Sequence, residues 1–186
     1  TRFSCLCTLD AQASFVPRWR PPFVSALAAE DRCHLTGMAI EDGRPRYVTA
    51  LGMTDEAGGW RPGKADGGIV IDVDRGEVIA EGLSMPHSPR VVGERLLVLD
   101  SGHGRICRVD PADGSREPIA ELPGYTRGLA VVGPVAFVGL SKIRERQHFG
   151  GLPIEDRLGE AERACGVWAV ELATGRVLGF MRFEAG

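Results

Sequence analysis

Two histidines and a tyrosine hold matching places in three similar stretches of the chain, and their side chains could do chemistry together. HLTGMAIEDGRPRYVTALG begins at His34, HSPRVVGERLLVLDSG at His87, and YTRGLAVVGPVAFVGLS at Tyr125. Imidazoles around one opening could bind a metal, act as general acid or base, or hydrogen-bond a polar ligand. The alternative is structural, with each histidine capping backbone groups where a strand begins. No third histidine falls in register, which disfavours a metal site at His34 and His87.

Basic side chains follow the same stretches. Arg90 and Arg127 come shortly after the starts of the second and third stretches, and Lys142 and Arg144 follow the end of the third. Together they could form a cationic cluster, and the planar guanidinium of arginine suits a carboxylate or a phosphate. The structural alternative is that each arginine pairs with a nearby aspartate or packs its aliphatic part on apolar surface.

Two tryptophans have different expected roles. Trp60 follows two glycines in an irregular segment, so we expect an exposed ring that could stack on a ligand or partner. Trp168 lies in the apolar run GVWAVEL and is expected in the core. The chain carries no nucleophile elbow, zinc-protease, phosphate-loop or dinucleotide-binding motif.

The repetition predicts the elements that position these residues. Each stretch is followed by a strand-like run with an acidic residue near its end, namely GIVIDVD, RICRVD and GVWAVEL. The middle unit predicts four strands, at 87–92, 95–100, 105–110 and 117–122, with Pro-Ala-Asp-Gly as the last turn. Four antiparallel strands in one repeat are typical of a propeller blade, which buries its faces on its neighbours.

The predicted fold is therefore an all-β propeller of four-stranded antiparallel blades, with one short helix in an insert. Residues 1–33 would supply part of a blade, with 34–81, 82–122 and 123–183 as blades and 141–165 as an insert. This makes about three and a half blades within one domain or fragment, residues 1–186. Propellers close with about four to eight blades, so we expect further blades or domains in a longer protein.

The order of strands within a blade predicts where the site lies. The link that begins the first strand and the link from the second to the third strand lie on one face, and the inserts 54–66 and 141–165 extend that face. Within the second insert, residues 153–165 have helical spacing and could form a lid over the channel or a surface helix. The candidate ligand contacts at this channel mouth are His34, Trp60, His87, Ser88, Arg90, Tyr125, Arg127, Ser141, Lys142 and Arg144.

Composition excludes several classes of protein. A net charge of −3 and a pI near 5.8 oppose nucleic-acid binding, and no apolar run is long enough to cross a membrane. Five irregularly spaced cysteines predict reduced thiols in the cytoplasm. Zinc at Cys5, Cys7, Cys33 and His34 is disfavoured because the usual paired spacing is absent. We expect no cofactor, with a divalent metal as the minor alternative.

Several phrases resemble an uncharacterised bacterial family, the DUF4915 family. They include TRFSCLCTLD, FVPRWRPPFVSALAAEDRCHLTGMA, GLSMPHSPR, LPGYTRGLA and FVGLSKIRE, and they cover nearly all of the chain. The resemblance implies propeller-like repeats and longer relatives, and it brings no established activity. It marks as signature positions His87, Ser88, Pro89, Arg90, Arg127, Gly128, Ser141, Lys142 and Arg144.

Three functions are compatible with these patterns. The leading hypothesis is a binding module that holds a small polar or anionic molecule, or a peptide segment, at the channel mouth. The second is a propeller enzyme, such as a lactonase-like hydrolase or a lyase, that uses His87 with or without a metal. The third is a scaffold for protein contacts, which an exposed apolar patch around Trp60 and the second insert would favour.

Overall fold

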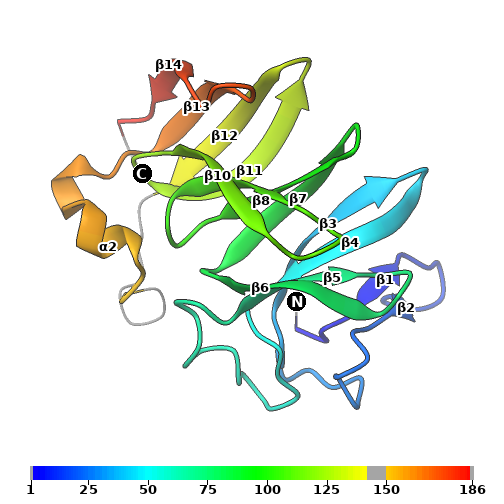
Figure 1. The fold of residues 1–186 in the computed structure, drawn as a ribbon. Helices are drawn as coiled ribbons and strands as arrows, with labels where there is room; N and C mark the ends of the chain where they lie inside the picture. Colours follow the sequence, from blue (N-terminus) through cyan, green and yellow to red (C-terminus); the bar gives the residue numbers. More distant parts are fainter. Residues whose placement is uncertain (1, 142–149, 185–186) are drawn as a thin grey trace.

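The chain folds almost entirely into antiparallel strands. The computed structural model describes residues 2–141 and 150–184. Its sheets follow one another in chain order, from the N-terminal segment at one end to the last strands at the other (Figure 1). Each four-stranded sheet runs in sequence order without a crossover, and apart from the two inserts its strands are joined by short turns, as the turn-rich sequence predicts.

Three sheets repeat the same plan, and we number them sheets 1, 2 and 3. Sheet 1 contains β3 (Leu35–Glu41), β4 (Arg44–Ala50), β5 (Gly68–Asp72) and β6 (Glu77–Leu83). Sheet 2 contains β7 (Pro86–Val92), β8 (Arg95–Asp100), β9 (Arg105–Val109) and β10 (Arg116–Glu121). Sheet 3 contains β11 (Tyr125–Val132), β12 (Val135–Ser141), β13 (Gly166–Glu171) and β14 (Val177–Arg182). The predicted strands are confirmed to within a few residues at their ends.

The N-terminal segment forms a smaller sheet. β1 (Leu6–Thr8) pairs with β2 (Val16–Trp19), which lies in the proline-rich stretch. Pro17 is tolerated because a sheet of two strands consists only of edges. Cys33 is buried against the first sheet, whereas Cys5 is half-buried and Cys7 is exposed.

The second strand of sheet 2 shows how the repeats form a core. Leu96 and Val98 pack toward sheet 1, and Leu97 and Leu99 pack toward sheet 3. A nearly continuous apolar strand is what burial on both faces requires. Trp168 is also buried between sheets 2 and 3, as predicted. Each buried aliphatic side chain of this kind contributes about 1.5–3 kcal/mol, so the interfaces between sheets carry much of the stability.

The turns between third and fourth strands fix the spacing of the sheets. Gly114 and Gly175 have φ of 72° and 71°, a region that favours glycine. A Cβ at Gly114 would lie 2.4 Å from the carbonyl oxygen of Ile79, and one at Gly175 would lie 1.9 Å from that of Ile119. Each turn therefore presses on the outer strand of the preceding sheet, and only glycine allows that approach.

The second insert is less helical than its spacing predicts. It contains one helical turn, α2 (Ile154–Arg157), and one 3-10 turn, Glu160–Glu162. The predicted helix over 153–165 is wrong beyond the first turn, because Leu158 adopts an extended conformation and Gly159 begins a new capped turn. The Glu162 carboxylate accepts a hydrogen bond from the Gly159 N–H at 2.8 Å, which stabilises the break.

Candidate site at the channel mouth

The first strands of the three sheets lie side by side, and their starts share one face of the molecule. β7 contacts both β3 and β11, and the Thr36 hydroxyl donates to the Pro86 carbonyl at 2.6 Å between the first two. Residues of both inserts, Trp60 and Ile154 among them, join Met85 and Tyr125 in one apolar cluster. The first strands and the inserts thus meet at one place, which we call the channel mouth.

His34 is held by a carboxylate and an indole. Its Nδ1 lies 2.8 Å from Asp31 Oδ2, which also accepts a hydrogen bond from Trp60 Nε1 at 3.1 Å. The His34 and Trp60 rings lie 4.7 Å apart, and the Arg61 guanidinium covers the indole at 4.9 Å. Because a carboxylate only accepts, Nδ1 of His34 is protonated and donates the hydrogen bond to Asp31. Asp31 therefore fixes the tautomer and orientation of the ring.

His87 lies in a buried polar cluster. Its Nδ1 is 2.8 Å from the Met85 carbonyl oxygen, 3.1 Å from Ser101 Oγ and 3.5 Å from the Tyr125 hydroxyl. The His87 and Tyr125 rings meet edge to face with centroids 5.8 Å apart. A carbonyl oxygen cannot donate, so Nδ1 of His87 is protonated and faces three oxygen atoms.

The surroundings keep His87 neutral. Burial and, to a smaller extent, the nearby charges of Arg127 and His34 lower the pKa of His87 from 6.5 to about 4, against the opposing effect of the Met85 carbonyl. With Nδ1 protonated and the ring neutral, Nε2 is a hydrogen-bond acceptor. Burial also raises the pKa of Tyr125, so its hydroxyl stays protonated. The cluster therefore presents uncharged groups of fixed polarity.

Arg127 brings positive charge to this neutral cluster. Its side chain is exposed, and no carboxylate pairs with it in the part of the chain that the structure describes. Arg90 lies further along β7, opposite Leu97, and its Nη1 donates to the Pro89 carbonyl at 2.8 Å. No carboxylate among the described residues pairs with Arg90. Lys142 and Arg144, the other predicted cations, lie outside the described residues.

The register of the first strands corrects one prediction. Leu35, Pro86 and Thr126 are equivalent because they pair with Ala50, Asp100 and Leu140, which pair in turn with Ile69, Arg105 and Gly166. The residues just before them are His34, Met85 and Tyr125, and those just after them are Thr36, His87 and Arg127. His87 is therefore equivalent to Arg127 and not to His34 or Tyr125.

The backbone conformations agree with this register. His34 and Met85, which hold the same position, both have left-handed backbones, with φ of 53° and 47°. All three first strands are irregular just after this point, and Ser88 and Gly128 have positive φ, 51° and 77°, at the bulges of β7 and β11. Aligning the sequences on the two histidines missed this register because the residue types at the equivalent positions differ.

Trp60 differs most from its predicted role. Only 4% of its surface is exposed, so the expectation of an exposed aromatic ring is wrong. The indole is buried because its N–H donates a hydrogen bond to Asp31 and its ring packs beside Leu51 and Met85. The Trp60 ring packs against the His34 ring and helps to hold it in place. Trp60 therefore does not contribute to an exposed apolar patch of the kind that would favour a scaffold for protein contacts.

The remaining predicted contacts border the mouth. Ser88 is half-buried at the bulge of β7, and Ser141, also half-buried, ends β12 opposite Tyr125. The one-turn helix α2 lies against the loop after β8, because the Ile154 N–H donates to the Gly102 carbonyl at 2.8 Å. Ile154 is buried in the apolar cluster of the mouth, so α2 packs against the side of the mouth.

Sequence reasoning missed Asp31 and undervalued Ser101. Both are polar residues whose importance comes from contacts with the two histidines. A signal for Asp31 was present in the spacing, since an aspartate three residues before a histidine occurs both at Asp31–His34 and at Asp100–His103. Nothing local marks Ser101, which reaches His87 only through the pairing of β7 with β8.

Three further features concern metal ions, thiols and membranes. Across residues 2–141 and 150–184, no three His, Cys, Asp or Glu side chains gather where a metal ion could be held. All five cysteines are free thiols. Of the helices in these same segments, none has the length and apolar character needed to cross a lipid bilayer.

The fold and the mouth together define the class of protein. Repeated four-stranded meanders, packed face to face with their first strands adjacent, are the blades of a β-propeller. The chain belongs to the DUF4915 family, described as a domain of unknown function, whose sequence model matches residues 1–186. No curated protein matches the chain.

Three solved structures are similar to this one. The computationally designed Ika4 protein matches with 12% identity and a TM-score of 0.46, over 80% of this chain and 72% of that one. The designed Ika8 protein matches with 12% identity and a TM-score of 0.43, over 83% of this chain and 37% of that one. BamB from Moraxella catarrhalis matches with 16% identity and a TM-score of 0.45, over 86% of this chain and 41% of that one.

Proposed function

We propose that this chain is a binding module that holds a small polar ligand with an anionic group at the channel mouth. The observation that carries the proposal is that the mouth holds two different polar groups. One is the neutral imidazole of His87, and the other is the exposed guanidinium of Arg127, which has no carboxylate partner among the described residues. Arg127 suits a carboxylate or phosphate oxygen. Nε2 of neutral His87 suits a hydroxyl or amine donor. A ligand with both groups, such as a hydroxy acid, fits best.

The hydrogen bonds that hold the two histidines of the mouth, His87 and His34, favour a binding role. His87 is held by Met85 and Ser101, and His34 is held by Asp31, so neither ring needs to be ordered by the ligand. Such preorganisation lowers the entropic cost of binding. A net charge of −3 gives the protein no general attraction for anions, so binding of an anion would depend on local groups. The free cysteines are compatible with a cytoplasmic protein.

A thermal-shift comparison tests the proposal. Wild type should be stabilised by hydroxy acids such as malate, and less by succinate, which lacks the hydroxyl group. Arg127→Gln should weaken binding by about tenfold to a hundredfold, the effect of losing a charge-assisted hydrogen bond of about 1.5–3 kcal/mol. His87→Gln should reduce the preference for the hydroxyl group.

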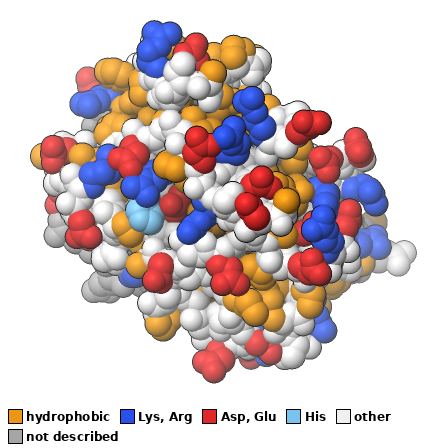
Figure 2. Space-filling model, viewed as in Figure 1, with side chains coloured by type: hydrophobic (Ala, Val, Ile, Leu, Met, Phe, Trp, Pro, Cys, Tyr) orange, Lys and Arg blue, Asp and Glu red, His pale blue; other side chains and the backbone are white. Residues whose placement is uncertain are grey.

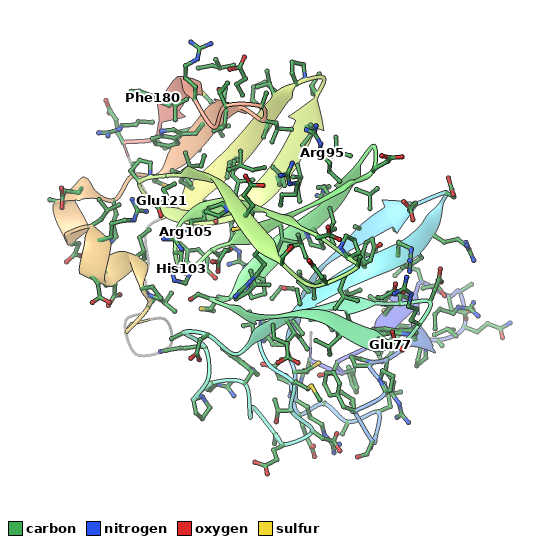
Figure 3. The ribbon with its side chains drawn as sticks, in the orientation of Figure 1. Glu77, Arg95, His103, Arg105, Glu121 and Phe180 are labelled. Carbon is green, nitrogen blue, oxygen red and sulfur yellow. The ribbon has the colours of Figure 1, made fainter. Side chains whose placement is uncertain are left out.

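The matched control is Arg95→Gln. Arg95 is also exposed, but it begins β8 at the opposite end of sheet 2, as Figure 3 shows. Arg95→Gln should bind like wild type. Equal losses in Arg95→Gln and Arg127→Gln, or no stabilisation by any acid in the panel, would contradict the proposal.

A further inference from the structure

A second group of basic side chains surrounds a pocket away from the channel mouth. The pocket has a volume of about 310 Å³ and lies between the outer strand of sheet 1 and the outer strands of sheet 2. Its lining includes Gly82, Asp100, His103, Arg105, Cys107 and Arg116. We call it the inter-sheet pocket. Figure 3 shows His103 and Arg105 close together with Glu121 near them, and Figure 2 shows a histidine on this face among basic and acidic side chains.

The carboxylates near the pocket already have partners. Asp100 is 5% exposed, and its Oδ1 accepts a hydrogen bond from the Ser84 N–H at 2.7 Å. Its Oδ2 lies 2.9 Å from Nδ1 of His103. Glu121 accepts from Arg105 at 2.6 Å. Asp100 and Glu121 therefore each already accept a hydrogen bond from within the protein.

Arg116 is the cation that remains. Within residues 2–141 and 150–184, no carboxylate pairs with it. Its guanidinium lies against Gly82, where a Cβ would come within 3.1 Å of Nη2. A glycine at this position lets the guanidinium cross from sheet 2 to the edge of sheet 1. An arginine held there without a counter-ion is suited to an external oxyanion.

His103 is the second basic group of the pocket. Its Nδ1 is buried and faces Asp100, although it is poorly aligned for a hydrogen bond. Because a carboxylate only accepts, Nδ1 carries a proton, and Nε2 donates to an external anion when the ring is the protonated imidazolium. Cys107 is also buried in the lining, and burial raises the pKa of its thiol to about 12, so the thiol contributes no charge. The pocket thus combines a carboxylate bonded to the Ser84 N–H, a neutral thiol, an imidazole and an unpaired guanidinium.

We propose that the inter-sheet pocket binds a small molecule through a single phosphate or carboxylate group, with Arg116 as the principal contact and the His103 imidazolium as a second donor. Arg105 flanks them while it stays paired with Glu121. The volume is at the lower end of the range for small-molecule sites, about 300–1,000 Å³, which fits a compact ligand. This site is independent of the channel mouth, because Arg127 and His87 do not line it.

The experiment uses inorganic phosphate and malonate as probes. The imidazole signals of the folded protein are followed by NMR during each titration at constant ionic strength, with sodium chloride as the balancing salt. The chain has only four histidines, and His103→Gln identifies the signal of interest. Saturable shifts of the His103 signal are expected in wild type. Arg116→Gln should weaken the affinity at least about tenfold.

The variants separate this site from general charge effects. Arg116 is exposed on an edge strand, so Arg116→Gln should keep the urea midpoint of wild type, and Arg116→Lys should keep more of the affinity than Arg116→Gln. Arg95→Gln and Arg127→Gln should bind like wild type. A linear, unsaturated shift that is equal in all variants would mean an adventitious ion only and would overturn the proposal. A loss in Arg127→Gln equal to that in Arg116→Gln would overturn it as well.

Discussion

Replacing His87 by glutamine should remove a measurable part of the acid sensitivity of the protein. In the folded state the pKa of His87 is lowered to about 4, against 6.5 for the free side chain. Between these pH values the unfolded chain takes up a proton at this residue and the folded chain does not. Stability therefore falls as the pH drops from about 6.5 to about 4.

The size of the effect follows from the two pKa values. A difference between 6.5 and about 4 corresponds to about 3 kcal/mol of unfolding free energy once the pH reaches the lower value. This figure applies to a side chain that is only 6% exposed, where screening by solvent is weak. About 3 kcal/mol is a large share of the stability of a typical domain, about 5–15 kcal/mol.

Urea unfolding at a series of pH values measures this contribution. In wild type the unfolding free energy should fall from pH 7 to pH 4 more steeply than in His87→Gln, with the difference between the two curves growing to about 3 kcal/mol. The His87 ring signal in NMR should titrate near pH 4. Arg95→Gln serves as the control, since no group that titrates in this range is changed.

One result would refute the reasoning. If His87→Gln loses stability on acidification as steeply as wild type, His87 does not resist protonation in the folded state. A titration of its NMR signal near pH 6.5 would lead to the same conclusion. The neutral acceptor on which the proposed ligand site depends would then be absent at acidic pH.

Three further substitutions test the core and the turns. Trp168→Ala should cost about 3–5 kcal/mol in urea unfolding, since the ring is buried between sheets, and a cost below about 1 kcal/mol would contradict this. Asp72→Asn should cost about 1.5–3 kcal/mol by removing a charge-assisted hydrogen bond from Arg46, which keeps Glu41 and Asp74 as partners, and the loss should shrink when Arg46→Gln is added. Gly104→Ala should cost more than Gly93→Ala: both have positive φ, but only at Gly104 would a Cβ meet backbone atoms, the nearest at 2.8 Å. Equal melting temperatures for the two glycine variants would show that the contact is relieved cheaply.

The sequence predicted the sheets well because their determinants are local. The run from Leu96 to Leu99 is apolar at every position and proved to be buried on both faces. The turn that ends in Gly114 carries residues whose backbone preferences are strong. The repetition of these two features in neighbouring units then fixed the order of strands, since each unit needs its neighbour to bury its faces.

The site was harder to predict because its geometry depends on bulges and on long-range contacts. The left-handed Ser88 shifts the register of β7, and serine gives no sign that it will adopt φ of 51°. Trp60 was expected in solvent because glycines precede it, but its indole binds Asp31, which lies 29 residues earlier in the chain. Composition around a residue does not indicate a partner at that separation.

The corrected register changes what the repeats contribute to the mouth. Thr36, His87 and Arg127 occupy one equivalent position in three sheets, directly after the equivalent residues Leu35, Pro86 and Thr126. A hydroxyl, a neutral imidazole and a guanidinium thus stand at the same height around the first strands. Thr36 is already engaged, because its hydroxyl donates to the Pro86 carbonyl. The backbone repeats from sheet to sheet, but the residue type at this position does not. The position therefore supplies an acceptor, the neutral His87 ring, and a cation, Arg127, on neighbouring strands. An unsymmetrical ligand with a donor at one end and an anionic group at the other matches that arrangement better than a symmetrical anion does.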